Sequence, residues 1–260
     1  MTRTAGDTGT GPQRLIDGVV DLFLPRRCAE CGATGAWLCP DCVARLRELT
    51  GPRCRRCGRP APEPARGCIE CRGRDLAFVS AAAAFSYEGP ARSLVKACKF
   101  RKLRSVVADM AALAGPRFAQ VCSAGGEQMP FDVVTWVPTT AGRRLDRGFD
   151  QAQVFARALA GGAGLAAAPL LQRTRAAGKQ SDLDRVGRAG NVHGAFVCTH
   201  PAGPQVTAAG AHTTRPSRVL IIDDVYTTGE TLYECATARS VEGYEPHVFT
   251  FARTVRGHPA

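Results

Sequence analysis

The chain has 260 residues, of which 45% are hydrophobic, so it is long enough for one medium-sized domain together with a small one. Its 34 lysines and arginines outnumber its 23 aspartates and glutamates, and the resulting net charge of +11 favours anionic partners such as phosphates, pyrophosphate or nucleic acid. No apolar run approaches the ~20 residues of a membrane-spanning helix, which argues against a membrane span.

The amino-terminal segment is polar. Residues 1–12 lack the apolar core of a secretory signal, and we expect them to be disordered. We therefore expect a cytoplasmic protein, whose thiols stay reduced. Residues 15–24 carry apolar side chains at helical spacing, which predicts a short amphipathic helix. The twelve cysteines of the chain then need an explanation other than disulfides.

Eight of these cysteines form four C-x-x-C pairs: Cys28/Cys31, Cys39/Cys42, Cys54/Cys57 and Cys68/Cys71. Two thiolates three residues apart can hold one Zn²⁺ from a tight turn, and two such pairs complete a tetrahedral site. The four pairs therefore predict two structural zinc ions. Sequential pairing is the simplest assignment, and an interleaved pairing is also compatible with the sequence. Little apolar material separates the pairs, so metal would supply the folding energy of this region.

The remainder of the chain alternates short apolar runs with helical patterns. Strands are predicted at residues 78–85, 132–137, 195–198, 219–222 and 246–254, and helices at 92–104, 106–113, 151–159 and 232–240. Loops are predicted at 122–130, at 173–191 and in a flexible insertion at 200–217. This alternation indicates an α/β fold, with a parallel sheet flanked by helices behind the cysteine-rich domain.

Basic side chains gather in three places. The segment 92–104 carries six and no acid: Arg92, Lys96, Lys99, Arg101, Lys102 and Arg104. A solvated helix face and an anion-facing role both fit this segment. The loop after the strand at 132–137 carries Thr139, Thr140, Arg143, Arg144 and Arg147, which suit a pyrophosphate at a sheet edge. The long loop 173–191 offers Lys179, Gln180, Arg185, Arg188 and Asn191, and such a loop can close over a substrate.

One stretch combines strand, acids and a helix start. Residues 218–231 read RVLIIDDVYTTGET, with Asp223 and Asp224 behind four apolar residues. Small residues at a helix start form an anion cavity from backbone N–H groups, and here Val225, Tyr226, Thr227, Thr228, Gly229, Glu230 and Thr231 would form it. The two carboxylates can accept hydrogen bonds from a diol or hold Mg²⁺ directly or through water. Phosphoribosyl pyrophosphate (PRPP) offers a monophosphate, a diol and a metal-bound group.

This stretch resembles the PRPP-binding signature of the type I phosphoribosyltransferases. The resemblance implies that the two acids contact the ribose hydroxyls and that the loop 226–231 holds the 5′-phosphate. An ATPase would need a Gly-x-x-x-x-Gly-Lys-Ser/Thr loop upstream, and the sequence has none.

The whole order of motifs is similar to the ComF family, bacterial proteins linked to competence and DNA uptake. The motifs that carry this similarity are the four cysteine pairs, Lys96 to Phe100, Arg147-Gly148-Phe149 with Gln151, Gln180 with Leu183, Arg188 with Asn191, and the string 223–231. The family commonly has Asn at the position of Asp150. The resemblance implies a helix plus double zinc ribbon at 13–76 and a phosphoribosyltransferase-like domain at 77–260.

The implied function is Mg-dependent binding of PRPP with pyrophosphate as the leaving group, in DNA uptake or nucleotide salvage. Asp223, Asp224, Arg147, Lys179 and Arg188 would then carry catalysis, with Arg143 and Arg144 beside the pyrophosphate. The alternative is a non-catalytic single-stranded-DNA-binding competence factor, or a scaffold for DNA-uptake proteins, that uses the zinc head and the basic faces.

Overall fold

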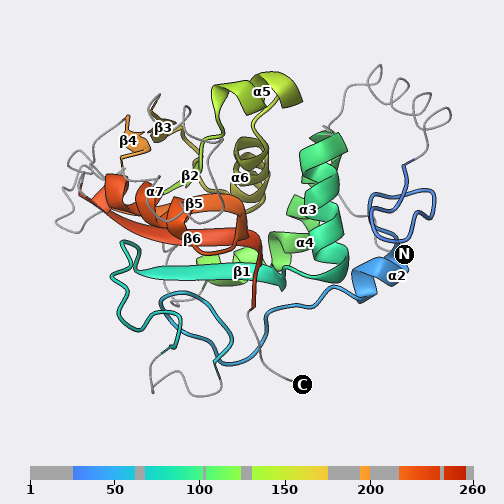
Figure 1. Cartoon of the computed structure of the whole chain (residues 1–260), viewed down its shortest axis with the longest axis horizontal. Helices are drawn as coiled ribbons and strands as arrows, with labels where there is room; N and C mark the ends of the chain where they lie inside the picture. Colours follow the sequence, from blue (N-terminus) through green and yellow to red (C-terminus); the bar gives the residue numbers. More distant parts are fainter. Residues whose placement is uncertain are drawn as a thin grey trace, which may run out of the picture.

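The computed structural model describes residues 26–61, 68–101, 104–123, 131–174, 194–199, 217–240 and 243–255 (Figure 1). The predicted disordered start and the predicted helix at 15–24 lie outside the described residues. So do nearly all of the predicted loop at 173–191 and of the insertion at 200–217.

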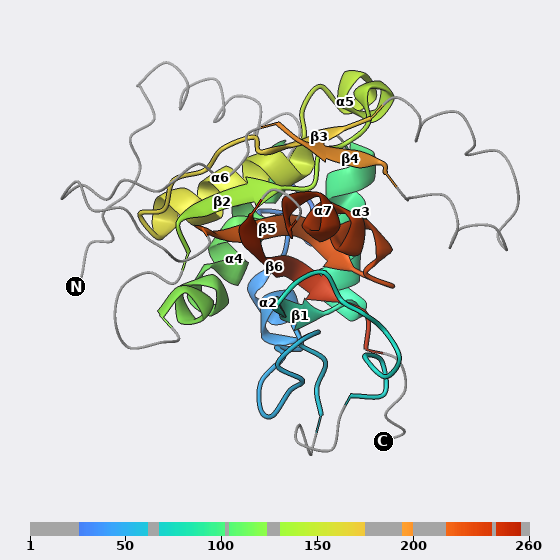
Figure 2. The same ribbon diagram turned by 90° about the vertical axis from the view of Figure 1, so that its left-hand side faces the viewer.

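A parallel sheet forms the centre of the molecule. Its strands are β1 (Ser80–Ser86), β2 (Val133–Trp136), β5 (Ser217–Tyr226) and β6 (Tyr244–Arg253). They follow one another in the order β1-β6-β5-β2, and every neighbouring pair is parallel (Figure 2). The run from Val219 to Ile222 in β5 is fully buried, because both faces of a parallel sheet are covered. The predicted parallel sheet flanked by helices is thus confirmed.

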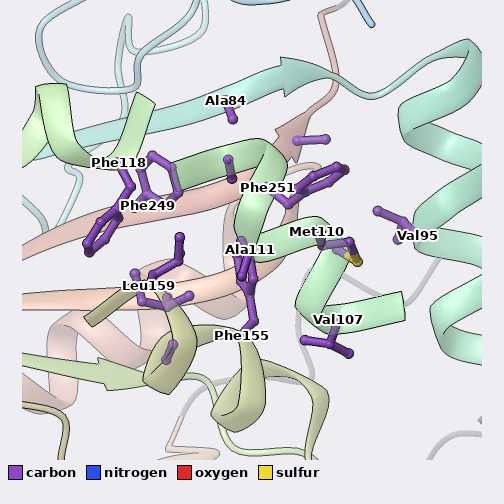
Figure 3. Close-up of a cluster of buried hydrophobic side chains, with 14 of the residues drawn as sticks. Ala84, Val95, Val107, Met110, Ala111, Phe118, Phe155, Leu159, Phe249 and Phe251 are labelled. Atoms are coloured by element: carbon purple, nitrogen blue, oxygen red, sulfur yellow. The ribbon is translucent and has the colours of Figure 1, made fainter. Parts of the chain in front are cut away.

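Two helices cover one face of the sheet. They are α4 (Arg104–Ser123), which follows α3 (Gly89–Arg101), and α6 (Gln151–Gly162). Aromatic side chains fill the space between layers: Phe118 of α4 meets Phe249 of β6 with ring centroids 5.1 Å apart (Figure 3). Such edge-to-face ring pairs add to the stabilisation that burial of apolar area provides.

The opposite face is covered by a more varied layer. It contains α7 (Glu230–Ser240) and an antiparallel pair, β3 (Leu171–Arg173) and β4 (Phe196–Cys198). The last four paired cysteines, Cys54, Cys57, Cys68 and Cys71, form a group that we call the second cysteine cluster. Its Cys54 and Cys57 are buried in the same layer, so this cluster helps to close the core of the sheet domain.

The first cysteine cluster packs against the other helical layer. It consists of Cys28, Cys31, Cys39 and Cys42, the last of which lies in α2 (Pro40–Ala44). Nearby, Trp37 donates a hydrogen bond from Nε1 to Ser105 Oγ of α4 at 3.0 Å. Between the two clusters, Leu49 N–H donates to the Ala84 carbonyl of β1 at 3.1 Å. This segment therefore occupies the outer edge of β1, which would otherwise present unpaired backbone groups.

Several elements differ from the sequence-based predictions. Helix α3 spans Gly89–Arg101 where 92–104 was predicted, and strand β3 was not predicted. The helix predicted at 106–113 extends through α4 to Ser123, so the loop predicted from residue 122 starts later. Residues Ala141–Arg147 form a short helix, α5, where a loop was predicted, because the Thr140 hydroxyl accepts a hydrogen bond from Arg143 N–H and caps it. Strand β5 continues four residues past the predicted end at Ile222, because β6 continues beside it.

We predict that any side chain at Gly58 destabilises the fold, because the second cysteine cluster approaches β1 closely at this residue. Gly58 has φ +69°, and a Cβ there would lie 2.3 Å from the Ala81 carbonyl oxygen. Gly58→Ala should lower the free energy of unfolding by about 3 kcal/mol or more. The matched variant Gly32→Ala has φ +83° in open space and should cost about 1–2 kcal/mol. Urea denaturation of the zinc-loaded proteins measures both, and equal losses would contradict the prediction.

Candidate functional site

The site forms where β5 extends beyond the end of its neighbour β2. Strand β2 pairs with β5 only as far as Trp136 opposite Ile222. Val137 N–H still donates to the Ile222 carbonyl at 3.0 Å, but the next donor on that side, Thr139 N–H, turns to Asp150 Oδ2 instead. On the other side, β6 pairs with β5 as far as Tyr226. Asp223 is the first residue of β5 without a partner in β2. A cavity of about 640 Å³ opens at this point.

Most of the predicted site residues in the described part of the chain line this cavity. Those that do are Thr139, Thr140, Arg143, Arg147, Asp223, Asp224, Val225, Thr227 and Thr231. Arg144, Tyr226, Thr228, Gly229 and Glu230 are not among its lining residues. Lys179 and Arg188 lie outside the described residues and stay predictions.

The two aspartates have unlike electrostatic environments. Lys99 of α3 places its Nζ 3.0 Å from each carboxylate oxygen of Asp224. Burial would lower the pKa of Lys99, but the charge and hydrogen bond of Asp224 together with the charge of Asp223 outweigh burial and raise this pKa. Among the described residues, no cation contacts Asp223 in this way: burial, together with the negative charge of Asp224, raises its pKa to about 8. The free site therefore keeps a proton on Asp223 to a higher pH than an ordinary carboxyl group does.

This charge balance fits a divalent cation. Asp224 is compensated by a lysine, whereas Asp223 has no contacting cation among the described residues, so a bound cation would supply the positive charge that lets Asp223 ionise. Asp223 also accepts a hydrogen bond at 2.8 Å from Asp224 N–H, which orients its carboxylate. The donor set of two carboxylates matches the oxygen ligands that Mg²⁺ takes, with water completing its coordination.

Arginines form the opposite wall. Arg143 and Arg147 come from α5, and Arg147 Nη1 donates to Gln151 Oε1 at 2.9 Å. Gln151 in turn donates to the Cys98 carbonyl of α3, so this wall is tied to the helix that carries Lys99. Arg173 approaches from β3, with its guanidinium 4.6 Å from the centre of the Phe196 ring. Burial lowers the pKa of Arg173, and the group offers donors to an anion in the cavity.

Asp150 has a structural task. Its two carboxylate oxygens accept hydrogen bonds from Thr139 N–H at 3.0 Å and from Gln153 N–H at 3.2 Å. It therefore caps α6 and fixes the strand end that precedes α5. An asparagine at this position could accept through its single carbonyl oxygen, which explains how both residue types can serve here.

The loop at residues 227–231 is held through its carbonyl groups. Thr254 N–H donates to the Tyr226 carbonyl at 2.9 Å, and Thr254 Oγ1 donates to the Thr227 carbonyl at 3.1 Å. Arg74 Nη2 donates to the Thr228 carbonyl at 3.1 Å. The first-turn N–H groups of α7 lack partners within the helix, as at any helix start, and they are suited to an anion.

Several cavity residues were missed as site residues. Lys99 was singled out only as one member of a basic segment, and an acid-free run of cations was its signal. Arg173 stood at the beginning of a predicted loop and carried no signal, because only the pairing of β3 with β4 brings it to the cavity. Phe100 also lines the cavity and is 77% exposed.

The cysteines form two separate four-sulfur clusters. Cys28, Cys31, Cys39 and Cys42 make the first, and Cys54, Cys57, Cys68 and Cys71 the second, with the four sulfurs of each cluster within 4.8 Å of one another. Neighbouring sulfurs such as those of Cys57 and Cys68 lie 3.6 Å apart. A Zn–S bond of about 2.3 Å in a tetrahedron requires about this spacing, so both clusters fit zinc. The pairing is sequential, and the interleaved alternative is excluded.

The first cluster also has a thiol suited to metal binding. Burial would raise the pKa of Cys28, but backbone N–H groups of Cys31, Cys39 and Glu30 outweigh it and lower this pKa to about 6. Thiolate is the form that binds zinc.

Comparison with known proteins supports the zinc-binding part. Residues 19–72 match the double zinc ribbon domain family, so the chain carries a double zinc ribbon with two Cys₄ sites. The DNA utilization protein YhgH of Salmonella typhimurium is 29% identical over 220 residues, which are 83% of this chain and 91% of that protein. YhgH of Escherichia coli K12 is 26% identical over the same shares.

Two solved structures are also similar. Glutamine PRPP amidotransferase from B. subtilis, complexed with ADP and GMP, aligns at 21% identity with a TM-score of 0.33 over 55% of this chain and 26% of that one. An allosteric regulatory enzyme of purine biosynthesis aligns at 16% identity with a TM-score of 0.34 over 60% and 28%. This chain thus spans about a quarter of each solved chain.

Every helix among the described residues is too short or too polar to cross a membrane.

The raised pKa of Asp223 predicts a pH-dependent stability. Without added Mg²⁺, the unfolded chain ionises this residue near the ordinary pKa of about 3.9, whereas the folded protein keeps the proton up to about pH 8. Between these values the folded state binds more protons, so its free energy of unfolding falls as the pH rises. Asp223→Asn should therefore raise the melting temperature more at pH 8 than at pH 5, as measured by differential scanning fluorimetry.

The control for this measurement is Asp75→Asn, since Asp75 is fully exposed on the zinc ribbon. Its effect should be small at both pH values. A change in melting temperature for Asp223→Asn that is the same at pH 5 and pH 8 would contradict the prediction.

Proposed function

We propose that the chain binds PRPP at the carboxyl end of β5 and is a phosphoribosyltransferase-like protein of the ComF type. One observation supports this more than any other. The acidic pair, Thr227 of the loop before α7 and two arginines of α5 line one cavity, although about 80 residues of sequence separate Arg143 from Asp223. Together they offer contacts for each polar part of PRPP.

Each part of the ligand has a matching set of groups. The 5′-phosphate would bind the amides and hydroxyls of the loop at 227–231, at the N-terminus of α7. Asp223 and Asp224 would accept hydrogen bonds from the ribose hydroxyls. Arg143, Arg147 and Arg173 would bind the pyrophosphate from the opposite wall. Lys179 and Arg188 are proposed to close over it.

The proposed reaction is transfer of the phosphoribosyl group. A bond forms between an acceptor nucleophile and the anomeric carbon, and the bond from that carbon to pyrophosphate breaks. Mg²⁺, when bound, would neutralise charge on the departing pyrophosphate. Arg143, Arg147 and Arg173 are already positioned before the bond breaks, and they would stabilise the same charge. The acidic pair lies beside the carbon on which positive charge develops.

Removal of both acids tests the ligand assignment. Asp223→Asn with Asp224→Asn keeps the side-chain volumes but removes both carboxyl groups, and we expect the affinity for PRPP with Mg²⁺ to fall at least ~100-fold, since hydrogen bonds to charged groups contribute about 1.5–3 kcal/mol each. Isothermal titration calorimetry measures this change. Asp75→Asn is the matched control and should bind as the wild type does. An unchanged affinity in a folded double variant would reject the assignment.

A second function is supported by the relatives that are named DNA utilization proteins and by the net charge of +11. In this alternative the protein binds single-stranded DNA through its zinc head and basic faces, without catalysis. Such binding must weaken with salt, by about −0.7 in the log–log slope for each phosphate contacted. A filter-binding series with an oligonucleotide, with and without PRPP, measures the slope. The absence of binding at low salt would contradict this second function.

A further inference from the structure

A buried arginine joins the second zinc ribbon to the end of the sheet. Arg253 is the last residue of β6, and its side chain is only 1% exposed. Its guanidinium donates to the Cys57 carbonyl and to Glu70 Oε2, the latter at 2.7 Å. Both acceptors belong to the second zinc ribbon. A charged side chain is buried this deeply only where its hydrogen bonds are satisfied, so the ribbon holds Arg253 in place.

The same guanidinium supports the tyrosine that precedes the loop. Arg253 Cζ lies 4.6 Å from the centre of the Tyr226 ring. Tyr226 is buried and also packs edge-on against Phe78, with centroids 6.4 Å apart. Gly229 lies directly against this ring, since a Cβ at Gly229 would be 2.7 Å from its atoms. The loop at 227–231 therefore lies on Tyr226, and Tyr226 lies on Arg253.

A second contact reaches the loop directly. Arg74 follows the last zinc ligand, Cys71, by three residues and donates to the Thr228 carbonyl at 3.1 Å. The second ribbon thus contacts the loop directly through Arg74, and it supports the loop indirectly by holding Arg253 against Tyr226. The first ribbon packs instead against α4 through Trp37.

We propose that the second zinc ribbon is the positioning element of the phosphate-binding loop, and that Arg253, Glu70 and Arg74 are its positioning residues. The nature of the ligand rests on the proposed function. The consequence concerns the 5′-phosphate: a displaced ribbon releases the Thr228 carbonyl and the ring beneath Gly229, so the loop amides lose their alignment. The arginine wall for the pyrophosphate belongs to α5 and β3, and its geometry does not depend on these residues.

This division gives a test with three ligands. Arg74→Ala should weaken ribose 5-phosphate and PRPP with Mg²⁺ about tenfold in calorimetry, the effect of losing one charge-assisted hydrogen bond, and should leave inorganic pyrophosphate with Mg²⁺ unchanged. Glu70→Gln, which removes the ionic partner of Arg253, should behave in the same way. Arg74→Lys retains a donor and should lose less. Arg72→Ala, an exposed arginine of the same ribbon, is the matched control.

Zinc content, measured by atomic emission, must equal that of the wild type in each variant, so that a weaker affinity reports the contact and not the loss of metal. An equal loss of affinity for all three ligands, or no loss for ribose 5-phosphate, would overturn the proposal.

A measurement without ligand separates this proposal from the proposed function. Hydrogen–deuterium exchange of peptides that cover 227–231 should be at least about fivefold faster in Arg74→Ala and Glu70→Gln than in Arg72→Ala. If the wild type binds none of the three ligands, the proposed function fails, and the exchange data still decide whether the ribbon orders the loop. Exchange that is the same in all variants overturns the positioning role.

Discussion

The unequal lengths of β2 and β5 determine where this protein has a site. The ladder on one side of β5 ends after Val137, because Thr139 N–H donates to Asp150 and not to β5, while β6 continues on the other side. The backbone of Asp223 and Asp224 is therefore held in an extended strand, and their half-buried side chains line the cavity. A rigid backbone that presents accessible carboxylates suits precise binding of a diol or a cation. The other lining residues of the cavity surround this end of β5.

Charge in the cavity is arranged to accept an anion together with a cation. Lys99 compensates Asp224, and a proton compensates Asp223, so the acidic pair repels a phosphate less than two bare carboxylates would. Arg143, Arg147 and Arg173 line the same cavity, and Asp223 is close enough to act electrostatically on Arg173. A ligand that carries both pyrophosphate and Mg²⁺ would meet complementary charge on both sides, which connects the electrostatics of the free site with the proposed substrate.

The zinc ribbons substitute for secondary structure around the sheet. The first contributes Trp37 and Cys42 to the core beside α4, and the second contributes Cys54 and Cys57 to the opposite layer. The segment between them covers the edge of β1. Because metal supplies their folding energy, these loop-rich segments can pack as closely as helices do, and the ribbon that contacts the loop at 227–231 can hold it firmly.

Local patterns in the sequence determined much of this protein. The C-x-x-C spacing specified two Cys₄ sites, and the apolar run with two acids and small residues specified a strand, a turn and a helix, because these depend only on near neighbours along the chain. The tertiary structure alone decided the rest. Lys99 and Asp224 are 125 residues apart, Arg253 and Glu70 are 183 apart, and Arg173 reaches the cavity through a strand pairing. Such contacts depend on how layers pack and on where a neighbouring strand stops, and no periodicity or motif encodes either.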